Sequence, residues 1–190
     1  TGSVFYHPEH CWVIVDHPEK VKIGISKLLT QLIANVKAVV LPRLGSFTGQ
    51  GECCAHVIQE AYILPVIAPL SGLIQAVNPR LKKEPELLIH DPNGEGWLMV
   101  IKPDNLGSEL KKLLFGRKAV AWYKSEEKAI IARVERILKQ NPTAAGQTMQ
   151  DGGVRITGLP DLLHSITSNQ KAHVLDFFIT RPKILQKIGI

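Results

Sequence analysis

The sequence predicts an α+β protein, mainly β, in which strands come first and helices follow. Short alternating or β-branched runs fill the first half of the chain, separated by turn signals such as Asp91-Pro92-Asn93-Gly94. From Leu106 onward the apolar residues recur at the period of a helix instead. A length of 190 residues with 45% hydrophobic residues is enough for one good core with an appendage.

Six runs have the composition of strands, and their close spacing favours a compact β sandwich or barrel. These runs cover residues 11–15, 21–25, 36–41, 52–58, 73–77 and 98–101. The stretch 57–72 reads as a strand, a tight turn, a second strand and an exit turn, so a further strand is expected there.

One short helix is expected to interrupt the strands. Ser26 has the side chain of an N-cap, because a serine hydroxyl can accept a hydrogen bond from a backbone amide of the first helical turn. The apolar residues behind it recur at helical spacing: Leu28, Leu29, Leu32 and Ile33.

Two helices are expected after the strands, a short one over 108–114 and a longer one around 119–139 that ends at Asn141-Pro142. The longer helix is amphipathic, so it must pack against another part of the molecule. Its apolar stripe consists of Val120, Tyr123, Ile130, Ile131, Val134, Ile137 and Leu138.

The C-terminal part begins with a loose segment, 143–153, and a short apolar run, 154–156. Pro160 then marks a helix start, since proline is favoured in the first helical turn. Ser168-Asn169 is expected to divide the helical tail in two.

Three divisions of the chain follow from these changes of pattern. Residues 1–106 form a β-sandwich domain, residues 107–140 form helices that pack on the sandwich, and residues 141–190 form a C-terminal helical extension. Thr1-Gly2-Ser3 lacks an initiator methionine, so it is interpreted as a processed end or a cut within a longer protein.

Several classes of site are not expected. The apolar runs are far shorter than the roughly 18 residues of a membrane span. His7, His10, Cys11 and His17 lack a second spaced pair of ligands, so no metal site is expected. No Gly-rich phosphate loop, nucleophile elbow or His-Glu-x-x-His is present, so the chain is predicted not to be an enzyme, with no catalytic residues.

Cysteine usage favours a reducing compartment. The chain has three cysteines, Cys11, Cys53 and Cys54. Because the number is small and odd, a disulfide framework is not expected. Without a leader segment in the sequence, the expected location is the cytoplasm.

The basic excess of the chain lies in its second half. Residues 1–106 hold 9 Lys and Arg against 10 Asp and Glu, whereas residues 107–190 hold 14 against 7, and the whole chain has a net charge of +6. A solvated helix face explains this excess, because no helix-turn-helix, finger or basic pattern interleaved with aromatics accompanies it. Nucleic acid is therefore not an expected partner.

A series of motifs resembles the glycine cleavage system H proteins. The resemblance opens at Phe5-Tyr6 and covers roughly residues 5–125, without gaps from Gly24 to Gly72. The motifs are His7-Pro8-Glu9-His10-Cys11-Trp12-Val13, Val21-Lys22-Ile23-Gly24-Ile25-Ser26, Leu41-Pro42-Arg43-Leu44-Gly45, Ala68-Pro69-Leu70-Ser71-Gly72, Glu84-Pro85-Glu86-Leu87-Leu88, Asp91-Pro92-Asn93-Gly94-Glu95-Gly96-Trp97-Leu98 and Ile101-Lys102-Pro103.

The resemblance implies a lipoyl-type barrel-sandwich hybrid, made of two small antiparallel sheets with peripheral and C-terminal helices. In the family, a hairpin reading Glu-Ser-Val-Lys-Ala presents a lysine that receives lipoate. That motif falls on Ile58-Gln59-Glu60-Ala61-Tyr62, so Ala61 stands at the lysine position and Ile58 at the glutamate. A methyl side chain offers no amine to acylate, so no cofactor is expected.

The hairpin tip is apolar and stiff, reading Ala61-Tyr62-Ile63-Leu64-Pro65. Three interpretations remain open: a contact surface for a partner protein, a surface covered by the chain's own extension, or the border of a small-ligand pocket. The protein-binding candidates are Glu60, Ala61, Tyr62, Ile63 and Leu64.

The extension is similar to the tail of a bacterial subgroup of H-protein-like domains that lack the lipoyl lysine. That subgroup opens with Tyr-His-Pro-Gly-His-Thr-Trp, where this chain has Glu9 for the glycine and Cys11 for the threonine. The tail match rests on Gln150-Asp151-Gly152-Gly153, on Leu162 and Leu163, and on the close at Phe177-Phe178-Ile179-Thr180.

The predicted function is a non-lipoylated binding or regulatory module with an unidentified protein partner. Family H proteins are typically acidic, so their usual glycine cleavage partners are not expected to bind this basic chain well. The alternatives are a genuine lipoyl carrier that uses another lysine, or one domain of a larger redox or metal-containing protein.

Overall fold

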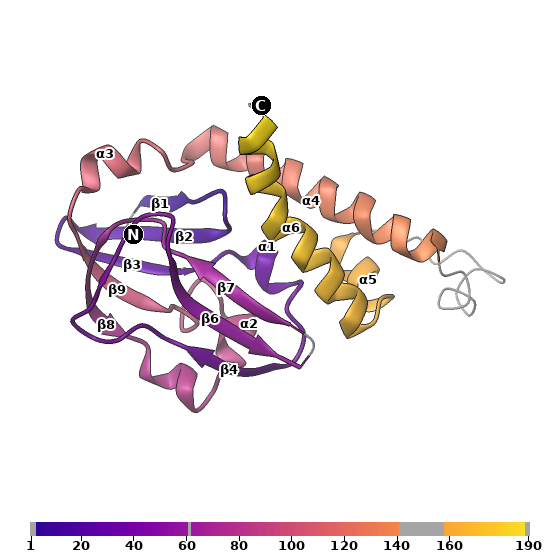
Figure 1. Ribbon diagram of the computed structural model, residues 1–190, viewed down its shortest axis with the longest axis horizontal. Helices are drawn as coiled ribbons and strands as arrows, with labels where there is room; N and C mark the ends of the chain where they lie inside the picture. Colours follow the sequence, from indigo (N-terminus) through magenta and orange to yellow (C-terminus); the bar gives the residue numbers. More distant parts are fainter. Residues whose placement is uncertain (1–2, 61, 141–157, 189–190) are drawn as a thin grey trace.

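The protein is a two-sheet sandwich covered on one side by helices, as the computed structural model shows for residues 3–60, 62–140 and 158–188 (Figure 1). The larger sheet has the order β1-β2-β3-β9-β8-β5, the smaller one the order β4-β6-β7, and every pairing is antiparallel. The strands are β1 Ser3–Tyr6, β2 Cys11–His17, β3 Lys20–Ile25, β4 Val36–Val40, β5 Phe47–Thr48, β6 Cys53–Gln59, β7 Ile63–Ile67, β8 Gly72–Val77 and β9 Met99–Pro103.

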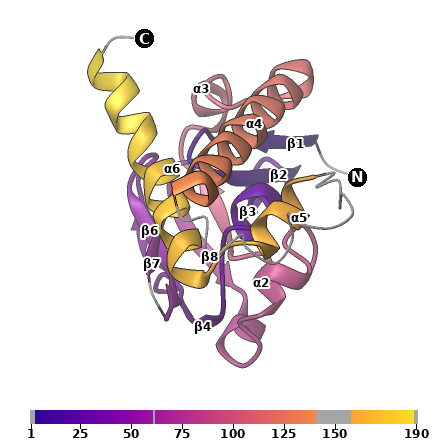
Figure 2. The same ribbon diagram turned by 90° about the vertical axis from the view of Figure 1, so that its right-hand side faces the viewer.

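Short helices connect the strands, and longer ones follow them. Figure 2 shows α4, α5 and α6 outside the sheets, with α6 beside β6 and β7. The helices are α1 Lys27–Thr30, the 3₁₀ helix η1 Pro79–Lys82, α2 Leu87–His90, α3 Leu106–Leu110, α4 Gly116–Gln140, α5 Leu159–His164 and α6 Ser168–Ile188.

The predicted fold class is confirmed, and all six predicted strand runs fall within observed strands or overlap them. The stretch 57–72 indeed contains a hairpin, β6 and β7, followed by the exit turn. Two strands were not predicted. The strand β5 has only two residues, and β1 gains its strand conformation by pairing Val4 with Ile14 rather than from its own pattern.

The cap of α1 is confirmed. Ser26 has an extended backbone, and its hydroxyl accepts a hydrogen bond from the amide of Leu29 at 3.3 Å. The four apolar residues predicted to share one face are all buried: Leu28, Leu29, Leu32 and Ile33.

The helix predicted over 108–114 lies earlier, at α3. It ends at Leu110 because Leu114 leaves the helix to exchange two backbone hydrogen bonds with Tyr6, of 2.9 and 2.8 Å. This bridge attaches the segment between α3 and α4 to the first strand.

The long helix is confirmed as α4, but one residue of its predicted stripe is wrong. Ile130, Val134 and Ile137 are buried, whereas Val120 is 55% exposed and Ala119 is buried in its place. At 100° per residue, Ala119 lies about 20° from the direction of Ile130, while Val120 lies about 80° away. Val120 therefore falls outside the buried face.

The helical tail is divided where the sequence predicted. Pro160 lies in the first turn of α5, and α6 begins at Ser168. The segments 143–153 and 154–156 lie outside the described residues.

One continuous core joins the sandwich to the helices. It includes Ile23 and Leu64 from the sheets together with Ile130, Val174 and Phe178 from the helices. Such burial is worth roughly 1.5–3 kcal/mol for each large aliphatic or aromatic side chain, before the entropy of ordering is counted.

A buried polar contact also crosses this junction. His10 lies in the turn between β1 and β2 with a left-handed φ of 66°, and its Nε2 is 3.7 Å from Oε2 of Glu126 in α4. Its ring lies against Trp122, with 5.1 Å between the ring centroids. Polar and aromatic contacts together therefore fix α4 to the sandwich.

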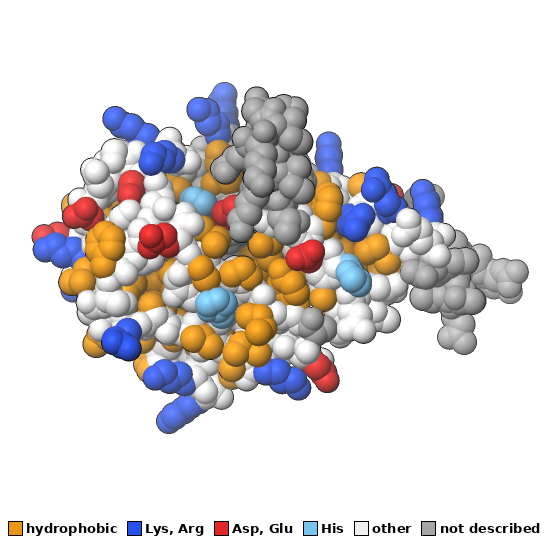
Figure 3. Space-filling view, viewed as in Figure 1, with side chains coloured by type: hydrophobic (Ala, Val, Ile, Leu, Met, Phe, Trp, Pro, Cys, Tyr) orange, Lys and Arg blue, Asp and Glu red, His pale blue; other side chains and the backbone are white. Residues whose placement is uncertain are grey.

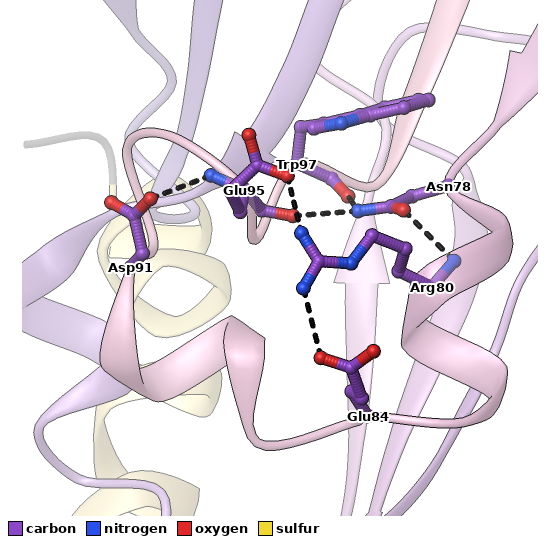
Figure 4. Close-up of polar contacts among 6 residues, drawn as sticks. All are labelled: Asn78, Arg80, Glu84, Asp91, Glu95 and Trp97. Atoms are coloured by element: carbon purple, nitrogen blue, oxygen red, sulfur yellow. Dashed lines mark hydrogen bonds and ion pairs between the residues drawn. The ribbon is translucent and has the colours of Figure 1, made fainter.

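A polar network fixes the loop between α2 and β9. The guanidinium of Arg80 donates to Glu84 at 2.9 Å and to Glu95 at 2.7 Å, and Figure 4 shows it lying between the two carboxylates. Asn78 donates through Nδ2 to the carbonyls of Glu95 and Trp97.

The same loop holds the largest core side chain. Trp12 donates through its indole N–H to the carbonyl of Pro92 at 2.9 Å. Its ring lies directly against Gly24, where an added Cβ would be 2.2 Å from the ring. The motif 91–98 is thus a structural element of the sandwich.

Candidate functional site

The hairpin of β6 and β7 holds the residues predicted to bind a partner. Its strands pair with Ile58 opposite Ile63, and the amide of Gln59 donates to the carbonyl of Tyr62 at 3.0 Å. The side chain of Gln59 accepts a hydrogen bond from the amide of Ala34 at 2.9 Å. The end of the hairpin is therefore tied to the segment before β4.

The five predicted contact residues have different environments. Glu60 is exposed, Tyr62 is half-buried and Ile63 is 58% exposed, whereas Ala61 lies outside the described residues. Leu64 has no exposed surface and belongs to the core, because alternate residues of a strand point to opposite faces. Its side chain is thus not available to a partner, and among the described residues of the tip the accessible ones are Glu60, Tyr62 and Ile63.

The C-terminal extension contacts the hairpin. The hydroxyl of Tyr62 donates a hydrogen bond to Oδ1 of Asp176 in α6, at 3.4 Å. Burial raises the pKa of Tyr62, and the nearby carboxylate of Asp176 raises that pKa further. Helix α6 therefore lies against one side of the hairpin end, while Ile63 remains exposed on the other.

An apolar surface continues from the hairpin end over the outer face of the smaller sheet. One row across the strands contains Ala38, Ile58 and Ile63, and the next contains Val40, His56 and Pro65. Figure 3 shows hydrophobic side chains gathered over β4, β6 and β7. We call these six residues the outer face.

The sequence analysis proposed the tip as a contact site but included neither the outer face nor Asp176. The strand period could have found the face, since Ala55, Val57 and Gln59 point inward and His56 and Ile58 therefore point outward. Asp176 has no signal in the sequence, because its contact with Tyr62 spans 114 residues.

The three cysteines are free thiols in different environments. Burial raises the pKa of Cys54 to about 12 and that of Cys11 well above its usual value. Cys53 is exposed, with its Sγ 3.4 Å from Nε2 of His56. Cys53 is therefore the accessible thiol of the hairpin.

Within residues 3–60, 62–140 and 158–188, no group of three or more His, Cys, Asp or Glu side chains could hold a metal ion. In the same part of the chain, no helix is both long enough and apolar enough to cross a membrane.

The fold and the sequence motifs both agree with one protein family. The family model described as glycine cleavage H-protein matches residues 4–126. The chain belongs to the glycine cleavage H-protein family. This assignment agrees with the expectation that the chain is not itself a catalyst.

Relatives in this family are similar over the sandwich. A probable glycine cleavage system H protein of Pyrococcus abyssi is 34% identical over 123 residues, which are 65% of this chain and 91% of that protein. The glycine cleavage system H protein of Aeromonas hydrophila is 37% identical over 109 residues, 57% of this chain and 84% of that protein.

A solved H-protein structure confirms the architecture. The crystal structure of a glycine cleavage system H protein from Mycobacterium marinum matches with a TM-score of 0.56 and 25% identity. The match covers 66% of this chain and 98% of that one. The family match ends at residue 126, within α4, so α5 and α6 lie beyond it.

Proposed function

We propose that this chain is a non-lipoylated member of the H-protein family, a binding or regulatory module whose hairpin end contacts a protein partner. The observation that carries the proposal is Ala61, which stands at the position where the family motif has its lipoyl-accepting lysine. Because lipoate is joined to a lysine amine through an amide, an alanine methyl group has no atom that could accept it.

Neighbouring residues support the loss of the carrier role. The sequence contains no lysine between Lys37 and Lys82, so no amine within the hairpin itself replaces the missing one. Ile58 occupies the position of the motif's glutamate, which removes a second feature of the hairpin.

The surface at the hairpin end, where the family presents its lipoyl lysine, has properties of a protein contact. Ile63 is exposed at the hairpin end, and the outer face extends the apolar area across three strands. Tyr62, a residue type common among strong interface contacts, is held by Asp176, so less side-chain freedom is lost on binding.

The charge of the chain supports a partner other than the usual glycine cleavage enzymes. A net charge of +6 is unsuited to surfaces that complement acidic H proteins. The partner is therefore proposed to be a protein with an apolar patch that fits the hairpin end.

A site-specific cross-linking experiment tests the proposal. A photoreactive amino acid at position 63 of the full chain should capture one protein in the native host, and Ile63→Asp should abolish binding of that protein. Leu44→Asp is the matched control, because Leu44 is 62% exposed and belongs to neither the hairpin nor the outer face. Equal binding by wild type and Ile63→Asp would refute the role of the hairpin.

A further inference from the structure

A second surface, at the start of α4, is strongly basic. Between Leu110 and Ser125 the sequence contains five cations and no Asp or Glu. The cations are Lys111, Lys112, Arg117, Lys118 and Lys124, and all five are exposed. Figure 3 shows Lys and Arg side chains along the upper edge of the molecule, over α3 and α4.

The acidic residues that flank this stretch are turned into the protein. Glu109 is buried, and its two oxygens accept hydrogen bonds from the amide of Ser71 at 2.7 Å and its hydroxyl at 2.6 Å. At the other end, Glu126 lies 3.7 Å from the buried His10. Neither carboxylate is therefore placed to neutralise the exposed cations.

Two large apolar side chains stand among these cations. Phe115 and Val120 are both exposed. One face of the Phe115 ring stacks on Phe5, with 4.8 Å between the ring centroids. Arg117, Val120 and Lys124 are spaced three and four residues apart, so they share one face of α4.

The backbone holds this surface in place before any ligand binds. The two hydrogen bonds between Tyr6 and Leu114 fix the segment after α3, and Leu113 is buried. The ammonium of Lys112 donates to the side-chain oxygen of Gln50 at 3.0 Å. Ordering this surface on binding therefore costs little entropy.

We propose that the start of α4 binds the surface of a bilayer containing anionic lipids. Basic side chains attract anionic headgroups, and single apolar side chains among them can enter the boundary between headgroups and acyl chains. A bilayer surface can bind a protein without a complementary pocket. Such binding suits the surface proposed here, because it is formed by one helix end and the turn before it. Nucleic acid is a weaker fit, because Trp122 and Tyr123 are half-buried and the exposed Phe115 is already stacked on Phe5 by one face of its ring.

Vesicle sedimentation with the full chain tests this proposal. Wild type should bind vesicles of equal parts phosphatidylglycerol and phosphatidylcholine at low salt, should not bind pure phosphatidylcholine, and should be released as salt is raised. The variant R117E/K118E/K124E should bind the mixed vesicles at least ~100-fold more weakly, since each cation near an anionic surface contributes roughly fivefold. Glutamate is favourable at positions 117 and 118 in the first turn of α4, and Lys124 is exposed, so this variant should fold.

A matched control carries the same charge change elsewhere. The variant K37E/K82E/K83E reverses three exposed cations away from α4 and should keep most of the binding. Val120→Ser should weaken binding by up to about tenfold without affecting the fold, because Val120 is already exposed.

Three outcomes would overturn the proposal. These are no binding of wild type to the mixed vesicles at low salt, an equal loss in both triple variants, and stronger binding to duplex DNA or polyglutamate than to vesicles at matched charge concentration.

Discussion

The hydroxyl of Tyr62 lies 3.4 Å from Oδ1 of Asp176, so the end of the β6–β7 hairpin is joined to helix α6 across 114 residues of sequence. The hairpin end is therefore neither a free arm nor fully covered, because Tyr62 is half-buried beside α6 while Ile63 is exposed. The interpretation that the chain's own extension covers the tip therefore describes one side of this surface, and a partner contact at Ile63 stays a prediction.

A double-mutant cycle measures this contact. Tyr62→Phe and Asp176→Ala should each lower stability slightly, with a coupling of about 0.5–1 kcal/mol, because a solvent-exposed hydrogen bond contributes little net free energy. Chemical denaturation of the two single variants and the double variant gives the coupling. Fully additive effects would show that the bond does not hold the hairpin against α6.

Truncation of two neighbouring residues of β7 should change the stability to very different extents. Leu64→Ala should lower the free energy of unfolding by about 2–5 kcal/mol, because Leu64 is completely buried. Ile63→Ala should change it by less than about 0.5 kcal/mol, since its side chain is mostly exposed. Urea denaturation of both variants checks this, and similar losses would mean that the strand faces are assigned wrongly.

The extension should stabilise the sandwich through Phe178. Phe178 is 1% exposed and Phe177 is 37% exposed, so the two adjacent phenylalanines form a matched pair. Phe178→Ala should cost about 3–5 kcal/mol, whereas Phe177→Ala should cost much less, although it removes contacts with the guanidinium of Arg133 at 4.9 Å and with the ring of Phe178 at 5.7 Å. If Phe178→Ala melts like wild type in calorimetry, α6 does not pack on the core.

Stability should depend on pH through His7. Burial lowers the pKa of His7 from 6.5 to about 4, and its Nδ1 accepts a hydrogen bond from the amide of Glu9 at 3.1 Å. Between these pH values the unfolded chain binds a proton that the folded chain does not. The free energy of unfolding should therefore fall as pH drops from about 6.5 to 4, by at most about 1.4 kcal/mol per pH unit from this group.

The variant His7→Asn isolates this contribution, because asparagine keeps a hydrogen-bond acceptor but does not titrate. Denaturation curves between pH 4 and 7 should have a shallower pH dependence in the variant. Parallel curves for the two proteins would assign the acid sensitivity to other groups.

The sequence predicted the sandwich well because its signals are local. Alternation marks β6, and the hydroxyl of Ser26 caps α1 only three residues away. Contacts between distant segments have no such signal. The pairing of Tyr6 with Leu114 ended α3 early, and a shift of one position put Ala119 rather than Val120 in the core.

Some residues of the candidate site could be predicted from the sequence, and others could not. Ala61 could be found from the motif alone, and Ile63 is exposed as a contact residue requires. Leu64 was placed on the contact surface because apolar character was taken to imply exposure at the tip, whereas strand alternation turns its side chain inward.

The central claim, that this member of the H-protein family is not a lipoyl carrier, is tested most directly by intact-mass spectrometry after co-expression with a lipoate ligase and lipoate. A lipoylated H protein prepared in parallel is the positive control. The account predicts that the wild-type chain keeps its unmodified mass while the control gains one lipoyl group. A wild-type chain that gains the mass of a lipoyl group on any lysine would contradict it.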